Sequence, residues 1–495
     1  MRAQHLRLSS AFACAIMAGL GLGCAINPVT GTPDYVLMSE EDEIALGDQT
    51  RKEVLQAQSL YADPEIAARV EEIGQALAAN SHRPGIEYRF GVLDSEEVNA
   101  FALPGGHIFI TRGLLAHLNS DAELAAVLGH EIGHVAARHA VRQHSKTQTA
   151  RPLAYVASIF ARAYTPGYVP LDPGNLADLL GGVILSGYGR EHELEADRLG
   201  AEYLIRLGYD PKALLRVIGF LKDQEQFEIE RAREEEREPR VYHGLFATHP
   251  SQDARLREVV ESAGSPEIEK PRPENSESFL KLLDGLTWGP SSDRGVVRGR
   301  HFYHSGLGFA LSFPRDWFVQ NQGQQLLAIA PGNEAALELS IRDRGSHTTP
   351  EEFLRWEMRV AATANTAAYR VAGLPAFTAV ARRDTTWGRR DVRIIVMFVG
   401  TRAYVFQGAT RDYDELAHYD RHFFDTAGSF HALSERERAR TRGPQLRTVR
   451  AKPDTRYEDL ARQSPVDHPE QTLRILNGDY PDREPVSGSL IKVVR

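Results

Sequence analysis

The sequence predicts an α+β protein, because stretches with helical periodicity and stretches with strand periodicity occupy different parts of the chain. Residues 39–58 and 64–80 place apolar side chains at helical spacing, whereas residues 86–92 alternate like a strand. Residues 296–434 contain five strand-like runs, with a helical stretch at 350–364 among them; the runs are 309–313, 326–330, 336–342, 393–399 and 403–409. Residues 447–495 have the pattern of strand, helix, helix and strand. We therefore expect a mainly helical first domain with a small β-hairpin at its edge, then an α+β domain and a small third domain.

The chain divides into five segments. Residues 1–23 are expected to be a signal peptide and residues 24–263 the first folded domain. Residues 264–295 begin with a stretch rich in Pro, Glu and Ser and are expected to be a linker. Residues 296–434 and 445–495 are expected to be the second and third domains.

The composition is that of an ordinary globular protein. The 495 residues suggest two to four domains, and 42% hydrophobic and 25% charged residues are typical of folded chains. The net charge of −9 and the absence of a long basic cluster argue against nucleic acid as a main partner.

The N-terminus resembles a secretion signal. Arg2 and Arg7 give a basic start, and residues 10–23 form an apolar stretch too short to span a membrane. Cys24 follows Gly-Leu-Gly, which resembles a lipoprotein processing site where the cysteine is lipidated. Ala25 follows instead of Asp, so we expect an outer-membrane anchor facing the periplasm of a Gram-negative bacterium; cleavage by the ordinary signal peptidase is the alternative.

The sequence HEIGH at residues 130–134 indicates a metal site. On a helix His130 and His134 lie on one face, where two neutral imidazoles can bind one Zn²⁺. Glu131 is placed to take a proton from a zinc-bound water. The alternative is a core helix with two hydrogen-bonded histidines.

The surrounding helix favours the metal site. Ser120 is suited to cap its N-terminus, with Glu123 completing a capping box. Apolar residues follow on two faces of the helix, a pattern typical of a buried helix. Two histidines inside a buried helix need partners, and a metal ion supplies one.

A third ligand is expected from REHELEADRLG at residues 190–200. Glu193 and Asp197 are four residues apart on a helix, so one carboxylate would bind zinc and the other would orient a ligating histidine. Gly200 shares their face and would allow close helix packing. His139 lacks the spacing and the glycine of HExxHxxGxxH, so we expect it at the surface or behind a ligand. The alternative for this segment is a solvated charged face.

HEIGH, then ELEAD, then GYDP, resembles the gluzincin family of the bacterial HtpX and BepA proteases, the mitochondrial Oma proteases and the type I CAAX prenyl proteases. The resemblance covers residues 35–262 and includes NAFALPGGHIFITRGLL at 99–115 and ATHP at 247–250. It implies that Glu193 is the third zinc ligand and that Asp197 lies behind the ligands.

Two further elements of this region have expected roles. Pro104-Gly105-Gly106 is a turn between two apolar runs, so a hairpin is expected, and its edge strand would align an extended peptide beside the zinc. His249 precedes Pro250, which favours an extended or turn conformation. It would stabilise the oxyanion, or cap the resting zinc and keep the enzyme quiet. The alternatives are an ordinary hairpin and an exposed loop histidine.

The later domains carry weaker resemblances. FALSFPRDWFVQN at residues 309–321 resembles the PsbP-like fold, which suggests a substrate-selecting or docking domain, with an inert spacer as the alternative. Residues 447–495 resemble a LysM module, which binds N-acetylglucosamine chains such as peptidoglycan. Pro453-Asp454-Thr455 stands where Gly-Asp-Thr is usual, and a packing domain is the alternative.

Together these observations predict a zinc metalloendopeptidase with one Zn²⁺ per chain. The resemblance implies quality control of misfolded or stalled envelope proteins in the periplasm. A cell-wall peptidase that binds glycan, and a latent protease acting as a chaperone or scaffold, are the alternatives. In the predicted site, His130, His134 and Glu193 are the zinc ligands and Glu131 is the general base. Asp197 is the orienting carboxylate, and His249 is the oxyanion or gate residue.

Overall fold

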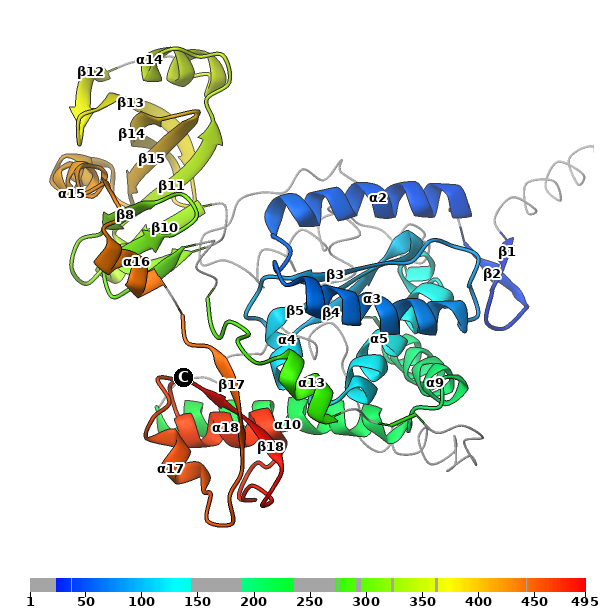
Figure 1. Ribbon diagram of the computed structural model, residues 1–495. Coiled ribbons are helices and arrows are strands. Elements are labelled where there is room, and N and C mark those ends of the chain that lie inside the picture. The colour runs from blue at the N-terminus through cyan, green and yellow to red at the C-terminus, as the bar shows by residue number, and fades with distance from the viewer. Residues whose placement is uncertain are drawn as a thin grey trace, which may run out of the picture. The chain divides into compact units, whose positions relative to one another are not determined.

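The computed structural model describes residues 24–36, 38–143, 188–235, 272–273, 276–290, 295–321, 325–360, 364–441 and 443–495. The chain is α+β and forms two compact units (Figure 1). Unit 1 contains Met1–Trp288 and Pro444–Arg495, and unit 2 contains Gly289–Gly443. None of the helices in the described ranges combines the length and the apolar character that crossing a bilayer requires.

Unit 1 is built around a three-stranded mixed sheet in the order β3-β5-β4. β3 (Arg89–Leu93) runs parallel to β5 (His107–Thr111), and β4 (Ala100–Leu103) runs antiparallel to it. The turn between β4 and β5 covers Pro104–Gly106, and its two glycines have φ angles of 74° and 97°. Only glycine adopts these angles freely, so the turn depends on them. The expected hairpin is confirmed.

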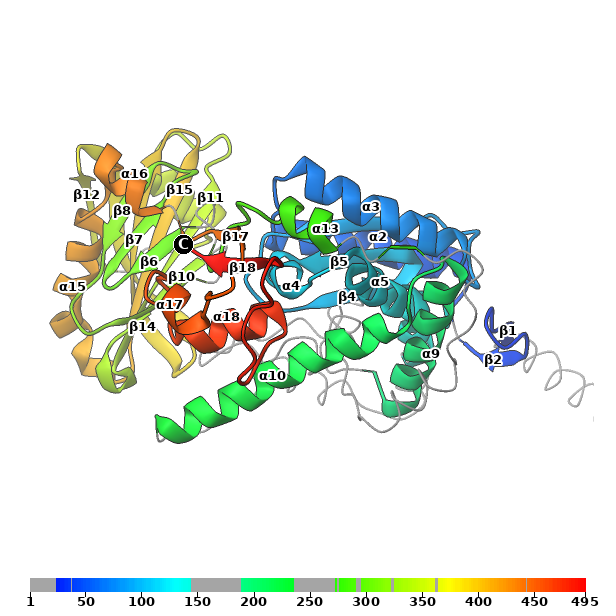
Figure 2. The same cartoon turned by 60° about the horizontal axis from the view of Figure 1, so that its bottom comes forward.

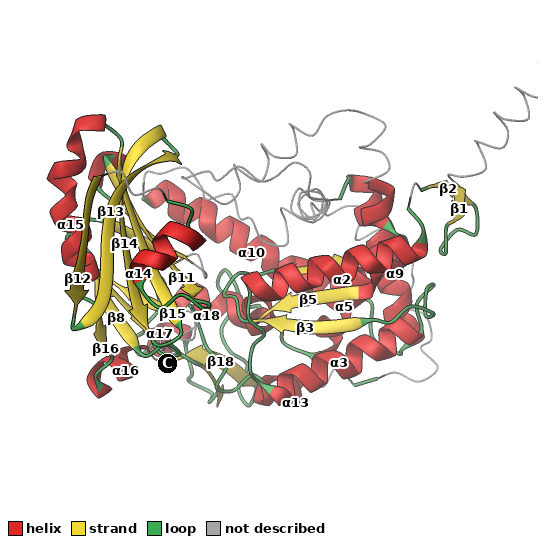
Figure 3. Cartoon of the chain, turned by 90° about the horizontal axis from the view of Figure 1, so that it is seen from above, coloured by secondary structure: helices red, strands yellow, loops and turns green. Residues whose placement is uncertain are grey.

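Helices cover both faces of this sheet, as Figure 3 shows for α2 and α3. α2 (Glu40–Ala57) packs its apolar residues against a small cluster on one face. α3 (Pro64–Ala79) and α5 (Asp121–Ala136) pack on the other face, in the main core of unit 1. The two helices predicted at the start of the chain therefore exist close to their expected limits.

α5 begins at a capped N-terminus and is buried along its length. The side chain of Ser120 accepts a hydrogen bond from the backbone N–H of Glu123 at 3.2 Å. Glu123 accepts from the N–H of Asn119 at 2.7 Å, one residue earlier than a capping box predicts. Every residue of α5 except His130 is buried. The expected buried helix is confirmed.

Two further helices pack against α5. α9 (Arg190–Arg206) crosses it, and the chain leaves α9 through Gly208 at φ 82°, the left-handed residue expected after the helix end. α10 (Lys212–Glu234) also contacts α5 and runs beside α18 (Pro469–Asn477) from the end of the chain (Figure 2).

Residues 444–495 contain a strand, two helices and a strand, in the expected order. β17 (Leu446–Arg450) pairs antiparallel with β18 (Leu490–Val494), and α17 (Tyr457–Ala461) and α18 lie between them in sequence. We expected a separate domain here, whereas the structure places the segment in unit 1. A two-stranded sheet with two short helices buries too little apolar surface to stand alone. Its apolar side chains therefore join the core that contains α5: Leu446, Tyr457, Leu473, Leu476, Val493 and Val494.

A helix also lies within the expected linker. α13 (Ser276–Leu282) and the following turn bury Phe279, Leu283 and Leu286 in the same core. These apolar residues recur at helical spacing, which the Pro-rich start of the linker had obscured.

A buried lysine ties the C-terminal strand to the start of α5. Lys492 in β18 is 0% exposed, and its Nζ donates to the carbonyl oxygens of Ala116 at 2.7 Å and Leu118 at 2.9 Å. These carbonyls lie at the end of α4 (Arg112–His117) and just after it. Burial lowers the pKa of Lys492 to about 7, although the charge of Glu123 opposes the shift. A neutral amine keeps two N–H groups, so both hydrogen bonds persist after deprotonation.

Unit 2 is formed by antiparallel sheets. Seven strands pair in the order β12-β13-β14-β15-β11-β10-β9, and four pair in the order β16-β8-β7-β6. Their bounds are Val296–Arg298 (β6), His301–His304 (β7), Phe309–Ser312 (β8), Phe318–Asn321 (β9), Gln325–Ile329 (β10), Ala335–Asp343 (β11), Ala364–Val371 (β12), Leu374–Thr385 (β13), Gly388–Val399 (β14), Arg402–Thr410 (β15) and His431–Ala432 (β16). All five strand-like runs noted in the sequence fall within or overlap these strands.

Helices pack on both faces of the seven-stranded sheet. α15 (Leu416–Gly428) covers one face, and α14 (Pro350–Glu352) with the π-helical turn Phe353–Glu357 packs on the other. The sequence predicted a helix over 350–364, which is too long. Arg359 adopts a left-handed φ of 51°, which ends the helical stretch before β12.

We predict that Lys492→Met changes how the stability of the protein depends on pH. Burial lowers the pKa of Lys492 from 10.5 to about 7, so the unfolded chain binds one more proton between these values. The free energy of unfolding of the wild type should therefore rise with pH relative to the variant, by up to about 1.4 kcal/mol per pH unit. Chemical denaturation between about pH 7 and about pH 10 measures this.

Lys452→Met is the matched control, because Lys452 is exposed in the same C-terminal segment. Its difference from the wild type should stay constant over this pH range. A constant difference for Lys492→Met as well would contradict the assignment of a depressed pKa to the buried amine.

Candidate metal centre

Two imidazoles and a carboxylate converge on one point between α5 and α9. His130 and His134 are one helical turn apart on α5, and their Nε2 atoms lie 3.0 Å from each other. Glu193, in the first turn of α9, places its carboxylate oxygens 3.5 Å from Nε2 of His130 and 3.6 Å from Nε2 of His134. One donor atom of each residue lies within 4.8 Å of the others. The structure therefore brings together the three residues predicted as metal ligands.

Small residues let the two helices approach closely enough for this convergence. Gly129 faces Gly200, and a Cβ on Gly200 would lie 3.1 Å from the backbone nitrogen of His130. A Cβ on Gly133 would lie 2.9 Å from the carbonyl oxygen of Ala196. Backbone atoms cannot move aside as flexible side chains do, so larger residues would force the helices apart. The close packing expected at Gly200 is confirmed.

Asp197 lies one turn after Glu193 and contacts the back of His130. Its Oδ1 is 2.9 Å from Nδ1 of His130. A carboxylate accepts hydrogen bonds only, so Nδ1 of His130 carries a hydrogen, and Nε2 is the ring atom left to bind a cation, either a proton or a metal ion, on the side of Glu193. This placement is the one predicted for the second carboxylate of the ELEAD segment.

The donor set fits a zinc ion. Two Nε2 atoms that face each other beside a carboxylate concentrate electron pairs at one point, which favours a cation there. Burial alone would lower the pKa of His130, but the hydrogen bonds to Asp197 and Glu193, together with their charges, raise it well above its ordinary value. The same surroundings attract a metal ion. Two imidazole nitrogens and one carboxylate are a ligand set that zinc commonly takes.

Glu131 and Tyr188 lie close to the metal ligands. Glu131 follows His130 on α5 and is 0% exposed. Tyr188 stacks on His134 with ring centroids 4.2 Å apart. Burial raises the pKa of Tyr188, and the charges of Glu131 and Glu193 raise it further. Both carboxylates therefore act electrostatically on the Tyr188 side chain.

His139 is buried behind His134. It is 0% exposed, and the two ring centroids are 4.9 Å apart. Of the two positions we expected for His139, the surface is therefore wrong and the position behind a ligand is right. Sequence analysis did not single out Glu195 or Tyr188. Glu195 lies within ELEAD, but only the packing of α9 shows that it points toward His139.

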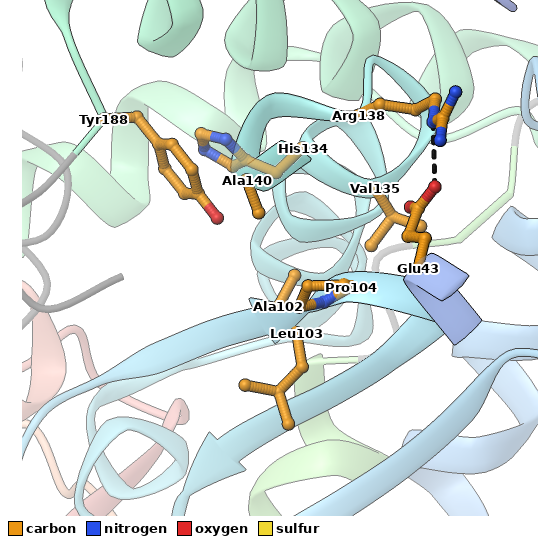
Figure 4. Close-up of a pocket in the computed structure, with 9 residues that line it drawn as sticks. All are labelled: Glu43, Ala102, Leu103, Pro104, His134, Val135, Arg138, Ala140 and Tyr188. Atoms are coloured by element: carbon orange, nitrogen blue, oxygen red, sulfur yellow. Dashed lines mark hydrogen bonds and ion pairs between the residues drawn. The ribbon is translucent and has the colours of Figure 1, made fainter. Parts of the chain in front are cut away.

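A small hollow of about 10 Å³ lies beside His134 (Figure 4). The end of β4 and the following turn form one wall, and α5 and the residues after it form another. The lining residues are Glu43, Ala102, Leu103, Pro104, His134, Val135, Arg138, Ala140 and Tyr188. Most of these side chains are apolar, and the hollow has room for about one water molecule next to the metal centre.

β4 forms the edge of the sheet nearest to the metal centre. It contacts α5, and within the described part of the chain β5 is the only strand that pairs with it. One row of its backbone groups therefore has no strand partner among the described residues. His249, predicted to approach the metal, lies outside the residues that the structure describes.

Comparison with known proteins finds a family that matches the metal centre. The model of the family described as "Peptidase family M48" matches residues 64–263, which include α5, α9 and all three candidate ligands. This part of the chain is therefore similar to peptidase family M48. The similarity and the donor set together indicate zinc at the centre formed by His130, His134 and Glu193.

Curated relatives of this chain are proteases and metalloproteases of bacteria and mitochondria. The Beta-barrel assembly-enhancing protease of Yersinia pestis is 31% identical over 338 residues, 63% of this chain and 65% of that protein. The mitochondrial metalloendopeptidase OMA1 of Arabidopsis thaliana is 37% identical over 139 residues, 28% of this chain and 26% of that protein. The metalloprotease YcaL of Escherichia coli is 28% identical over 204 residues, 41% of this chain and 77% of that protein.

The chain spans less than two thirds of the length of the assembly-enhancing proteases, 65% of the Yersinia protein and 45% of the one from Escherichia coli. Among solved structures, cyanobacterial PsbP from Synechocystis is similar over 28% of this chain and 95% of that chain, with 14% identity and a TM-score of 0.22.

We predict that Gly200→Ala destabilises the protein and weakens metal binding. The new Cβ would press on the backbone of His130, so α5 and α9 must separate and Glu193 moves away from the imidazoles. We expect a loss of about 1–3 kcal/mol in the free energy of unfolding. Thermal and chemical denaturation measure this loss, and competition with a chelator measures zinc affinity.

Gly219→Ala provides the control. Gly219 lies within α10, and a Cβ there would meet nothing within 4 Å. Alanine should stabilise this helix by about 0.5–1 kcal/mol, because it loses less backbone entropy than glycine on folding. If Gly200→Ala behaved like Gly219→Ala, the close approach of the two helices would not be needed.

Proposed function

We propose that this protein is a zinc-dependent metalloendopeptidase. The observation that carries the proposal is the convergence of His130, His134 and Glu193, with the buried Glu131 on the same helix. A purely structural zinc site has four protein ligands and needs no general base. Here three ligands are brought together among the described residues, which leaves a coordination position for reactants. Similarity to a peptidase family supports this reading.

The residues of the site divide the chemistry between them. His130, His134 and Glu193 would hold the zinc, which when bound supplies a Lewis acid that polarises the scissile carbonyl and makes water more acidic. Glu131 removes a proton from the attacking water and then donates it to the leaving amine. Asp197 keeps the hydrogen of His130 on Nδ1, so that Nε2 remains a ligand.

The sheet edge beside the site would align the substrate. An extended peptide can add to β4 through its backbone hydrogen bonds, as strands do in β-augmentation. Main-chain recognition tolerates many sequences, which suits a protease that acts on unfolded segments.

His249 has two proposed roles. It would either stabilise the oxyanion that forms on the attacked carbonyl, or cap the resting metal centre and hold the enzyme inactive. His249→Ala separates them. A loss of turnover with unchanged zinc content supports oxyanion stabilisation, whereas a gain supports the cap.

The proposed substrates are misfolded or stalled proteins of the bacterial envelope. Support comes from relatives named Beta-barrel assembly-enhancing protease. The signal-like residues 1–23 and Cys24 support a periplasmic location with a lipid anchor in the outer membrane. An unchanged outer-membrane proteome and envelope-stress response after deletion of the protein would contradict this role.

Peptidoglycan binding by the LysM-like residues 447–495 is a further proposal, tested by pull-down on purified peptidoglycan. Docking by the PsbP-like domain is another, tested by deletion of that domain.

We predict that Glu131→Gln binds zinc like the wild type but does not cleave casein. The substitution keeps the size of the side chain and removes the base, so turnover should fall by about 10²–10⁴-fold. Zinc content by atomic absorption and release of casein fragments are the two measurements.

Glu191→Gln is the matched control, because Glu191 is exposed in the first turn of α9. It should retain full activity. Cleavage by Glu131→Gln at the control's rate would refute the assignment of the base. A wild type that binds zinc without cleaving would instead favour a latent protease or scaffold.

A further inference from the structure

Behind His134, a second imidazole connects the metal centre to a carboxylate. Nδ1 of His134 lies 2.8 Å from Nδ1 of His139, and Nε2 of His139 lies 3.1 Å from Oε2 of Glu195. The same carboxylate oxygen accepts a hydrogen bond from Nη1 of Arg142 at 2.9 Å. Arg142 also forms an ion pair with Asp34 at 2.8 Å. A continuous series of polar contacts therefore connects Asp34, Arg142, Glu195 and His139 to the metal ligand His134.

The directions of the hydrogen bonds in this series follow from the charge of the Glu195 carboxylate. The carboxylate of Glu195 accepts only, so Nε2 of His139 must donate to it. His139 is fully buried, which favours its neutral ring with a single N–H. Its Nδ1 is then an acceptor, and it takes the hydrogen of Nδ1 of His134. The remaining nitrogen of His134, Nε2, is left with its lone pair toward His130 and Glu193.

We propose that Glu195 and His139 are positioning residues that fix the tautomer and ring orientation of His134, so that its Nε2 is held ready to bind the metal. This inference rests on the proposed zinc site. It assigns His134 an indirect carboxylate partner through a second histidine, whereas His130 contacts Asp197 directly. The two ligands are thus held by different means.

Stacked aromatic rings hold His134 and His139 in place. Tyr188 stacks on His134 with ring centroids 4.2 Å apart, and His192 stacks on His139 at 4.4 Å with an angle of 16° between the rings. His134 and His139 are nearly or fully buried, so water has little access to compete for their hydrogen bonds. Arg142 donates to the same oxygen of Glu195 and so helps to hold the carboxylate in place. Rotation of either ring would break a hydrogen bond and a stacking contact together.

The test measures zinc affinity of the full-length protein by competition with a chromophoric chelator. Glu195→Gln removes the carboxylate charge that accepts from His139, and His139→Leu removes the imidazole between Glu195 and His134. His139→Gln keeps one acceptor and one donor and is the conservative variant. Glu191→Gln, four residues before Glu195 on the same helix and exposed, is the matched control. Circular dichroism of each metal-free variant checks that it folds.

We expect Glu195→Gln and His139→Leu each to weaken zinc binding by about 10–100-fold, as loss of an outer hydrogen-bond partner does. His139→Gln should recover part of that loss, and Glu191→Gln should match the wild type. The visible absorption of the cobalt-substituted protein should change in Glu195→Gln and not in Glu191→Gln. If His139→Leu does not fold, His139→Gln and Glu195→Gln still test the proposal.

The double variant Glu195→Gln/His139→Leu tests whether Glu195 acts on His134 through His139, which we call a relay, or whether the two residues have independent structural effects. Glu195 acts on His134 through His139, so Glu195→Gln should cost little once His139→Leu is present. Losses that multiply in the double variant would overturn the relay. Zinc affinities equal to that of Glu191→Gln would also overturn it, while leaving the zinc site intact. A wild type that binds no zinc would instead refute the proposed function.

Discussion

The close packing of α5 against α9 is the constraint on which the rest of the site depends. Gly133 and Gly200 lack the side chains that would keep the two helices apart, and Glu193 can then reach the imidazoles of α5. This packing brings two imidazole nitrogens and a carboxylate to one point, where a positive charge relieves their electrostatic repulsion. Metal binding removes that repulsion, so stability and metal affinity are coupled in this fold.

Buried charges hold α5 at both ends. Near its N-terminus, Lys492 from the last strand donates to carbonyls just before the helix. At its C-terminus, Glu43 of α2 accepts from Arg138 at 2.8 Å and from Arg83 at 2.8 Å, and Arg83 also donates to the carbonyl of Val135. Removing Glu43 or one of its arginine partners would leave a buried charge without its partner, which strongly lowers the free energy of unfolding. The metal-binding helix is therefore positioned by segments from both ends of the chain.

Local patterns in the sequence predicted His130, Glu131 and His134 and most strands of unit 2, since short spacings such as HEIGH encode shared helix faces. The third ligand was narrowed by spacing to Glu193 or Asp197, and the resemblance to a known family then implied Glu193. Local patterns could not predict contacts between distant segments. The bond from Lys492 to Ala116 spans 376 positions, and that from His139 to Glu195 spans 56. No periodicity marks such pairs, which is why residues 445–495 were expected as a separate domain and Glu195 was overlooked. The helix expected at 350–364 was overestimated because a left-handed residue, Arg359, ends it.

X-ray absorption at the zinc edge of the purified wild type would report the ligands of the metal centre itself. We predict one zinc per chain, with two imidazole nitrogens at about 2.0–2.1 Å and carboxylate or solvent oxygen at about 2.0–2.2 Å. In Glu193→Gln, the imidazole signal should persist while occupancy falls. A protein with no stoichiometric zinc, or with a spectrum that lacks two imidazoles, would contradict the claim that α5 and α9 build a metal centre.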